Sequence, residues 1–181
     1  RYYDKAIAEG ITKSGQLSIR WIENRLNKYL NNILKTDDDY VIASDTDSVY
    51  LTLDKLVTKT IKSDNALSKT INFLDKVASE SIEPYITKSY DELKQYTNAF
   101  ANKMFMKREV IADKGIWVAK KRYILNVWDS EGVSYKEPKL KMMGIEAVKS
   151  STPAICRQKI KDALELIMTS DEKELNKFVI N

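Results

Sequence analysis

Apolar residues recur at intervals of three, four or eight positions over residues 4–35, which is the spacing of one face of an α-helix. These positions are Ile7, Ile11, Ile19, Ile22, Leu26, Tyr29 and Ile33. Residues 65–95 return to helical spacing. Asp64 or Ser63 is the expected N-cap of this helix, and Pro84 is expected to end or kink it. The pattern therefore predicts two long helices in the first half of the chain.

Between these helices the hydrophobic period changes. Residues 36–39 form a polar break, and two short, β-branched segments follow at 40–43 and 49–53. Such segments, separated by a few polar residues, are typical of a β-hairpin. The sequence between them, Ser44-Asp45-Thr46-Asp47-Ser48, predicts that the hairpin has an acidic tip.

The second half of the chain is expected to add more strands. Residues 103–111 and 116–128 are predicted as strands, with a hairpin turn at Asp113-Lys114-Gly115 between them. A second turn is predicted at Ser130-Glu131-Gly132.

Two helices are predicted at the C-terminal end, over Ala154 to Met168 and Asp171 to Ile180. Thr152 as N-cap, followed by Pro153 at the first helical position, is a strong start signal for the first of them. The order of helix, hairpin, helix, hairpin and helices indicates an α+β fold with an antiparallel sheet.

The composition narrows the chemistry. The 181 residues contain no histidine and one cysteine, Cys156, so a Ser-His-Asp or Cys-His nucleophilic site has no base. Zinc sites built from histidine and cysteine are excluded for the same reason. Any metal would take carboxylate and carbonyl oxygens, which favours Mg²⁺, Mn²⁺ or Ca²⁺.

The net charge of +4 is unevenly distributed. Residues 101–161 carry 14 basic and 6 acidic side chains, a local net charge of +8, while residues 1–100 have a net charge of −1. Clustered Lys and Arg bind nucleic acid by releasing counterions condensed on its phosphates. The segment is a candidate polyanion surface, and a solvated charged face is the alternative.

The acidic tip is a candidate metal site. Asp45 and Asp47 are held together by the hairpin, and two carboxylates so close repel each other unless a cation lies between them. The alternative is an ordinary Asp-rich turn, because Asp is a favoured turn residue.

Four segments carry a resemblance to a known family. The string Ala43-Ser44-Asp45-Thr46-Asp47-Ser48-Val49-Tyr50 resembles the Y-G-D-T-D-S motif of the family B DNA polymerases, with Ala43-Ser44 where Tyr-Gly or a similar small pair is usual. Lys120-Lys121-Arg122-Tyr123 is similar to their K-K-R-Y element. Residues 139–146, followed by Ser150-Ser151-Thr152-Pro153, resemble the palm-to-thumb junction of the T4-like bacteriophage enzymes, and Arg1-Tyr2-Tyr3-Asp4 resembles the stretch after their second motif.

This resemblance implies roles for particular carboxylates. Asp47 would bind both metal ions of a polymerase site, and Asp45 would lie beside it with a smaller or variable role in coordination. Glu109 matches a further palm carboxylate near the metals, and its alternative is a surface residue paired with Arg108 or a Lys. The implied cofactor is Mg²⁺, two ions in the complete site, bound weakly or not at all by this chain alone.

The resemblance also implies a DNA-binding set. It comprises Lys120, Lys121, Arg122, Tyr123, Lys141, Ser151 and Thr152. The first four would follow the primer terminus and the minor-groove side of the new duplex, where contacts do not depend on sequence. The alternative for those four is a set of alternating strand residues with Tyr123 in the core.

The implied organisation is a partial palm over residues 1–144, an antiparallel sheet with packed helices, and the first helices of a thumb over 145–181. The implied partners are primer–template DNA and deoxynucleoside triphosphates, with any sliding-clamp contact outside this chain. The resemblance to bacteriophage enzymes implies the cytoplasm of an infected bacterium as the location, and no secretion signal or membrane-spanning run is visible in the sequence.

Two further family motifs, D-x-x-S-L-Y-P-S and K-x-x-x-N-S-x-Y-G, do not occur in the sequence. The first supplies another metal-binding Asp and the second grips the triphosphate, so we expect the 181 residues alone not to polymerise. Two other functions remain open at this point. One is a non-catalytic nucleic-acid-binding module that uses the basic 101–161 surface, and the other is a D-x-D glycosyltransferase with Asp45 and Asp47 on a metal-bound nucleotide sugar.

Overall fold

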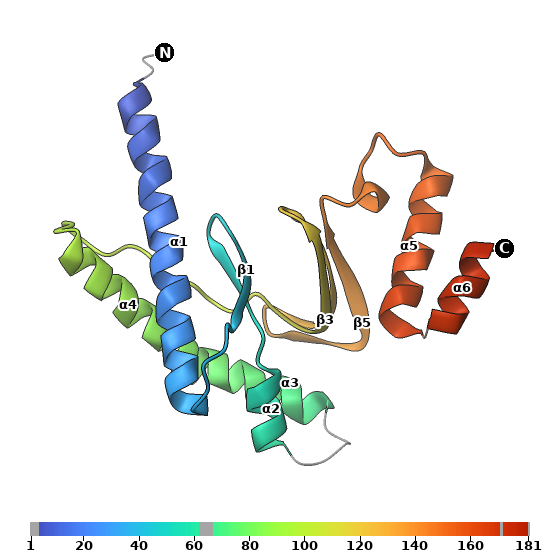
Figure 1. The fold of residues 1–181 in the computed structure, drawn as a ribbon, viewed down its shortest axis with the longest axis horizontal. Helices are drawn as coiled ribbons and strands as arrows, with labels where there is room; N and C mark the ends of the chain where they lie inside the picture. The colour runs from blue at the N-terminus through green and yellow to red at the C-terminus, as the bar shows by residue number, and fades with distance from the viewer. Residues whose placement is uncertain (1–3, 62–66, 171, 181) are drawn as a thin grey trace. The chain divides into compact units, whose positions relative to one another are not determined.

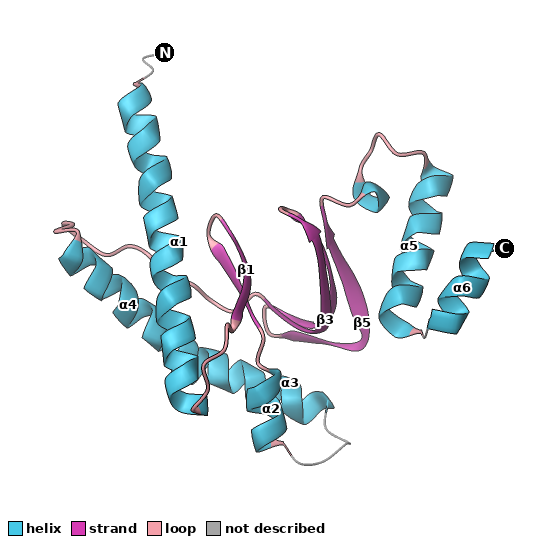
Figure 2. Cartoon of the chain, viewed as in Figure 1, coloured by secondary structure: helices cyan, strands magenta, loops and turns pink. Residues whose placement is uncertain are grey.

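The computed structural model describes residues 4–61, 67–170 and 172–180. It divides into two compact units, Arg1–Arg108 and Glu109–Asn181. Helices and antiparallel strands occur in both units (Figures 1 and 2), which confirms the α+β class. The predicted palm and thumb boundary at residues 144 and 145 is a functional assignment that this division does not address, and it stays a prediction.

The first unit contains most of the helical structure. Its elements in order are α1 (Lys5–Leu34), β1 (Val41–Asp45), β2 (Ser48–Leu51), α2 (Asp54–Thr60), α3 (Leu67–Val77), the π-helical segment η1 (Ala78–Ile82) and α4 (Glu83–Tyr96). The long first helix and the hairpin are where the hydrophobic pattern predicted them. The short helix α2 was not predicted.

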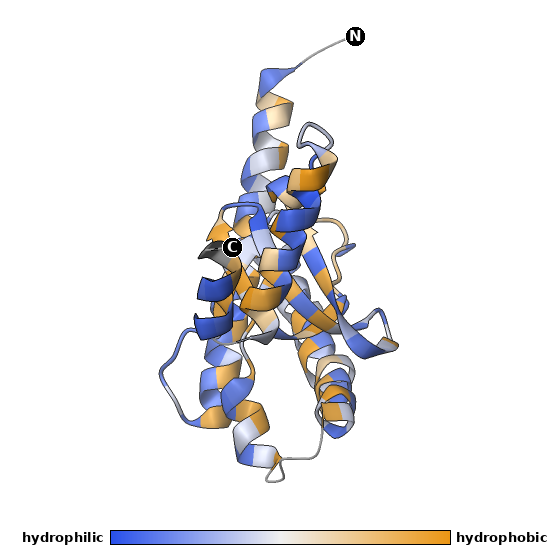
Figure 3. Cartoon of the chain, turned by 90° about the vertical axis from the view of Figure 1, so that its right-hand side faces the viewer, coloured by the Kyte–Doolittle hydropathy of each residue, from blue (hydrophilic) through white to orange (hydrophobic). Residues whose placement is uncertain are grey.

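Helix α1 begins at an aspartate cap. The Asp4 carboxylate accepts hydrogen bonds from the backbone N–H groups of Ala6 and Ile7, at 2.8 and 3.4 Å, which satisfies two N–H groups that have no partner within the helix. The helix ends at Lys35, whose φ of 55° is left-handed. Polar and apolar residues share each helix (Figure 3), as the amphipathic spacing requires.

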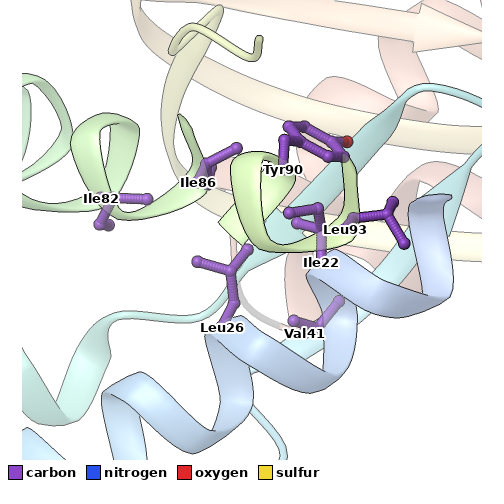
Figure 4. Close-up of a cluster of buried hydrophobic side chains, with 7 residues drawn as sticks. All are labelled: Ile22, Leu26, Val41, Ile82, Ile86, Tyr90 and Leu93. Atoms are coloured by element: carbon purple, nitrogen blue, oxygen red, sulfur yellow. The ribbon is translucent and has the colours of Figure 1, made fainter. Parts of the chain in front are cut away.

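The core of this unit lies where α1, α4 and the hairpin meet. Figure 4 shows its buried members, which are Ile22, Leu26, Val41, Ile82, Ile86, Tyr90 and Leu93. Burying an aliphatic side chain of this size contributes about 1.5–3 kcal/mol. The helix and the hairpin are therefore held against each other by a shared apolar contact.

The predicted break at Pro84 takes the form of a change in helix type. Five π-helical residues, Ala78–Ile82, separate α3 from α4, and Pro84 lies in the first turn of α4. A proline in a regular helix lacks an N–H and its ring collides with the carbonyl four residues earlier, so a wider turn just before it relieves both problems. The expected N-caps Ser63 and Asp64 lie outside the described residues.

The second unit is a three-stranded antiparallel sheet with helices. Its elements are β3 (Val110–Ala119), β4 (Arg122–Ser130), β5 (Val133–Met143), the 3₁₀ segment η2 (Glu146–Val148), α5 (Ala154–Thr169) and α6 (Glu172–Ile180), with sheet order β3-β4-β5. Residues of η2 and α5 pack on one face of the central strand. The buried residues of this contact are Ile124, Ile145, Ala147 and Met168.

One strand prediction and one turn prediction were wrong. Residues 103–109 do not form a strand, and Asp113-Lys114-Gly115 lies inside β3 rather than at a turn. The turn is at Lys120-Lys121 instead. Gly115 serves packing, because a Cβ there would lie 2.6 Å from the ring of Trp117 and 2.9 Å from Leu125. The predicted turn at 130–132 is confirmed.

The C-terminal helices are confirmed with a small shift at the start of the first. The N-cap of α5 is Pro153 and not Thr152, and it makes no side-chain capping bond. Thr152 instead closes the preceding turn, with its backbone N–H donating to the carbonyl of Lys149 at 3.2 Å.

Candidate functional site

The acidic hairpin tip is formed by a two-residue turn. Asp45 is the last residue of β1 and faces Ser48 of β2, so Thr46 and Asp47 make the turn between them. The Asp47 N–H donates to the backbone carbonyl of Asp45 at 2.5 Å. Asp45 is half-buried and Asp47 is exposed. The structure thus brings the two predicted carboxylates together at the end of one rigid element.

The turn contains a strained residue. Thr46 has a φ of 49°, in the left-handed region that β-branched residues rarely adopt. Its hydroxyl donates to Oδ1 of Asp45 at 3.0 Å, and the Ser48 hydroxyl donates to the Asp45 backbone carbonyl at 3.1 Å. These bonds hold the turn closed and fix one oxygen of the Asp45 carboxylate.

The donor set at the tip fits a hard divalent cation. Asp45 and Asp47 offer carboxylate oxygens, the ligands that Mg²⁺ takes from proteins, usually one or two carboxylates with water and substrate phosphates completing the shell. Within residues 4–61, 67–170 and 172–180, no three His, Cys, Asp or Glu side chains gather as a metal-binding cluster. The two aspartates are therefore a partial ligand set.

Glu109, the third predicted metal ligand, lies in the second unit, just before β3. Its carboxylate forms an ion pair with Nζ of Lys141 on β5, and its backbone carbonyl accepts from the N–H of Glu131 at 2.7 Å. The pairing of Glu109 with a lysine is thus present in this chain. Its role as a metal ligand stays a prediction, as does the contact of Lys141 with DNA.

The K-K-R-Y element spans the turn between β3 and β4. Lys120 and Lys121 form the turn and are exposed, and Lys121 has a left-handed φ of 60°. Tyr123, in contrast, is 6% exposed, with its ring 6.3 Å from that of Trp117. The structure therefore places the two lysines at the surface and Tyr123 in the core, the alternative position that the sequence allowed for it.

Arg122 is held by an acidic partner. Its Nη2 donates to both carboxylate oxygens of Glu146 in η2, at 2.6 and 2.5 Å, and Lys149 donates to the same carboxylate at 3.1 Å. The hydrogen bond from Lys149, the Glu146 backbone N–H and the charges of both cations hold the pKa of Glu146 below its usual value. Arg122 thus joins the start of β4 to the turn that precedes α5.

Ser151 and Thr152, the last predicted DNA-binding residues, lie in the turn before α5. Ser151 is exposed and Thr152 is half-buried. Both are in the same unit as the β3–β4 turn. Their contacts with DNA stay predictions.

Part of the basic excess of residues 101–161 is used inside the second unit. Lys114 donates to the carbonyl of Met168 at the end of α5, at 2.6 Å, and the ammonium of Lys139 lies 4.1 Å from the centre of the Tyr135 ring. Arg122, Lys141 and Lys149 also form ion pairs. Fewer cationic side chains are therefore available to bind a polyanion than the net charge of +8 suggests.

Sequence analysis missed two acidic residues, one that binds a predicted site residue and one that binds the residue before a predicted site residue. Glu146 binds Arg122, and Glu23 of α1 accepts a hydrogen bond from the Ser44 hydroxyl next to Asp45. Glu146 could have been found as one of few acids in a basic segment. Glu23 could have been found because it lies beside the apolar positions Ile22 and Leu26, on a face of α1 that packs against other elements.

None of the helices in the described part of the chain is both long enough and apolar enough to span a bilayer.

In comparisons with known proteins, no family model matches the chain. Over 182 aligned residues it is 42% identical to the DNA-directed DNA polymerase of Escherichia phage RB69, and over 194 residues it is 38% identical to that of Enterobacteria phage T4. These alignments cover 95% and 100% of this chain, and 20% and 21% of the two relatives, so the chain spans about a fifth of their length. The similarity to T4-like bacteriophage DNA polymerases expected from the motifs is confirmed.

Proposed function

We propose that this chain is a segment of a family B DNA-directed DNA polymerase of the T4-like bacteriophage type, and that the longer protein synthesises DNA on a template. The observation that carries the proposal is the 38–42% identity to two such polymerases along 95–100% of the chain. The paired carboxylates at the hairpin tip support it, because they supply the chemistry that this reaction needs.

Asp45 and Asp47 hold the divalent metal in this proposal. These carboxylates would hold two Mg²⁺ ions, and the chemistry supplied there would be activation of the primer 3′-hydroxyl and charge stabilisation of the leaving pyrophosphate. Asp47 is the main ligand and Asp45 the adjacent one. The exposed position of Asp47 leaves its carboxylate accessible to a metal, while the hydrogen bond from Thr46 restrains that of Asp45. The motif resemblance makes Glu109 a further candidate metal ligand.

The second unit binds the primer–template. Lys120 and Lys121, exposed at their turn, contact phosphates and thereby contribute affinity without sequence preference. Arg122, Tyr123, Lys141, Ser151 and Thr152 complete the predicted DNA-binding set. In this proposal Tyr123 contributes by supporting the turn from the core, since its side chain is buried.

The remaining features of the proposal rest on the resemblance of the sequence motifs to the family. Residues 1–144 form part of the palm and 145–181 begin the thumb. The substrates are primer–template DNA and deoxynucleoside triphosphates, and the protein works in the cytoplasm of an infected bacterium. The chain spans about a fifth of the relatives and lacks the two other family motifs, so the 181 residues alone do not polymerise.

Primer extension tests this proposal. The longer protein that contains this chain should extend a labelled primer on a template with Mg²⁺ and nucleotides, and the isolated 181 residues should not. The absence of extension by the longer protein would contradict the polymerase function, and extension by the isolated chain would contradict its dependence on the rest.

A non-catalytic nucleic-acid-binding module remains the second candidate, favoured by the net charge of +8 in residues 101–161. It predicts DNA binding by the longer protein without primer extension. A D-x-D glycosyltransferase accounts for neither the lysines at the β3–β4 turn nor the similarity to the two polymerases, so we do not pursue it.

A further inference from the structure

Three polar side chains of α1 follow one another at intervals of four residues along the face that meets the hairpin. They are Glu23, Asn27 and Asn31, which we call the polar ladder of α1. Residues four apart lie one above another on a helix, so the three form a row parallel to its axis. Each is half-buried.

The lower part of the ladder binds the loop that leads into β1. The Asn31 side chain accepts hydrogen bonds from the N–H of Asp38 and the hydroxyl of Thr36, both at 2.9 Å. It also donates to the backbone carbonyl of Asp38 at 2.8 Å. Asn31 thus forms hydrogen bonds to the loop through both its side-chain oxygen and its side-chain nitrogen.

The middle of the ladder binds the start of the strand. Oδ1 of Asn27 accepts from the N–H groups of Tyr40 and Val41, at 2.8 and 3.0 Å. Its Nδ2 donates to the carboxylate of Asp39 at 2.7 Å. Two consecutive backbone N–H groups on one side-chain oxygen fix where β1 begins along the helix.

The upper end of the ladder reaches the acidic tip. The Ser44 hydroxyl donates to Oε1 of Glu23, and Ser44 immediately precedes Asp45. Ser44 stands where the family motif usually has glycine, so this contact uses a side chain that the usual residue lacks. The contacts therefore run in the same order along the ladder and along the strand. Residue 31 contacts residue 38, residue 27 contacts residues 40 and 41, and residue 23 contacts residue 44.

Helix α1 is itself fixed by contacts outside the ladder. Trp21 donates its indole N–H to the carbonyl of Ser89 on α4 at 2.9 Å, and Arg25 forms an ion pair with Glu92 of the same helix. The apolar contacts of the core hold α1 and the hairpin together, but they are not directional. The ladder adds directional bonds between α1 and the chain from Asp38 to Ser44, which oppose sliding of β1 along the helix.

We infer that Glu23, Asn27 and Asn31 are positioning residues that set where Asp45 and Asp47 lie along the axis of α1. Glu23 acts through the Ser44 hydroxyl. The inference rests on the proposed function, in which these aspartates hold the catalytic metal. A displacement of about 1 Å at a catalytic group can cost about 100-fold in rate, so a small slip of the hairpin would be measurable.

The test uses the complete polymerase with Glu23→Ala, Ser44→Ala and the double variant. Each single variant should lower the rate of nucleotide incorporation about tenfold or more and raise the Mg²⁺ concentration for half-maximal rate, with unchanged affinity for primer–template. The double variant should be no worse than either single one, because both remove the same contact. Glu23→Gln keeps an acceptor oxygen and should retain most of the rate.

Asn24→Ala is the matched control for the helix. Asn24 is exposed on α1 and donates to the carbonyl of Arg20 in its own helix, so this change should leave both the rate and the Mg²⁺ dependence as in the unsubstituted enzyme. Additive effects of Glu23→Ala and Ser44→Ala would overturn the inference. So would a loss of thermal stability with an unchanged Mg²⁺ dependence. Loss of activity in Glu23→Gln would assign Glu23 to metal binding instead.

Hydrogen exchange provides a readout that does not depend on polymerisation. In the same protein, Glu23→Ala and Ser44→Ala should speed exchange of the Asp47 and Ser48 amides about tenfold, the effect of losing one hydrogen bond. Unchanged exchange would overturn the inference even in an active enzyme. Faster exchange in a protein that shows no primer extension would overturn the proposed function and leave the ladder's positioning role standing.

Discussion

Individual residues in left-handed conformation mark both tips that carry predicted site residues. Thr46 lies between the two aspartates with a φ of 49°, and Lys121 lies in the β3–β4 turn with a φ of 60°. Five non-glycine residues have a positive φ in the described part of the chain, and Thr46 is the β-branched one among them. Strain of this kind persists only where the surrounding contacts determine the conformation, and it is frequent at functional sites.

Gly144 allows the chain to pass close to the backbone of Lys121 in the β3–β4 turn. Its φ is 65°, and a Cβ there would lie 2.3 Å from the backbone carbonyl oxygen of Lys121. Gly144→Ala should therefore destabilise the chain through both backbone strain, about 1–2 kcal/mol, and overpacking, about 1–3 kcal/mol. The measurement is the free energy of unfolding of the 181-residue chain in denaturant.

Gly132→Ala is the control for this substitution. Gly132 also has a positive φ, 86°, but a Cβ there would meet nothing within 4 Å. It should lose only the strain contribution, about 1–2 kcal/mol. Equal losses for the two variants would show that the close approach of Gly144 to Lys121 has no energetic consequence.

At the scale of elements, amphipathic spacing predicted the long helices and the position of the first hairpin, but not the short helix α2. Of the predicted apolar face of α1, Ile22 and Leu26 are buried, whereas Ile7, Ile11 and Ile33 are exposed. The hairpin strands are mostly half-buried and do not alternate between buried and exposed positions.

The prediction of the β3–β4 turn failed because a segment rich in turn-forming residues was taken as the turn. Asp113-Lys114-Gly115 favours a turn locally, but Gly115 makes room for the Trp117 ring inside a strand. The real turn at Lys120-Lys121 contains no glycine.

Two other features, the conformation of segment 103–109 and the ion pair of Glu109, have no local pattern in the sequence that predicts them. The segment 103–109 is apolar enough for a strand, yet its residues Met106 and Arg108 pack against helices of the first unit, Arg108 through an ion pair with Asp75 at 2.6 Å. Tertiary contacts decided its conformation. The ion pair of Glu109 with Lys141 likewise depends on the fold of the sheet, because the two residues are 32 positions apart.

The Arg122–Glu146–Lys149 cluster should stabilise the link between β4 and η2 in a pH-dependent way. The pKa of Glu146 is lowered in the folded chain, chiefly by the hydrogen bond from Lys149. Its contribution to stability is therefore present above the ordinary glutamate pKa, about 4.3, and is lost as the pH falls below the lowered value. Glu146→Gln should lower the thermal midpoint at pH 7 and have a smaller effect at pH 3.

Lys136→Gln offers a comparison for this cluster, because Lys136 is exposed on β5. It should change the midpoint little at either pH. A difference between Glu146→Gln and the unsubstituted chain that is the same at pH 7 and pH 3 would mean that the ionised carboxylate of Glu146 does not stabilise the fold.

At the scale of the whole molecule, the sequence predicted which residues share one element better than which residues of different elements meet. Asp45 and Asp47 could be paired from spacing alone, since a hairpin brings them together. Glu109 could not be joined to them in this way, because it belongs to the second compact unit. The contact of Glu23 with Ser44 also escaped prediction, since it links positions 21 residues apart in different elements.

The most direct measurement is the effect of Asp47→Asn, in the longer protein that contains this chain, on primer extension and on primer–template binding, measured side by side. If Asp47 is the proposed main metal ligand, the change should lower the incorporation rate at least about 1000-fold, because metals contribute several kcal/mol to the transition state. DNA affinity should be nearly unchanged, and Asp37→Asn, at an exposed aspartate outside the hairpin, should be fully active. Asp47→Asn with unchanged extension, or with equal loss of extension and binding, would contradict a metal-binding hairpin at the centre of a polymerase site.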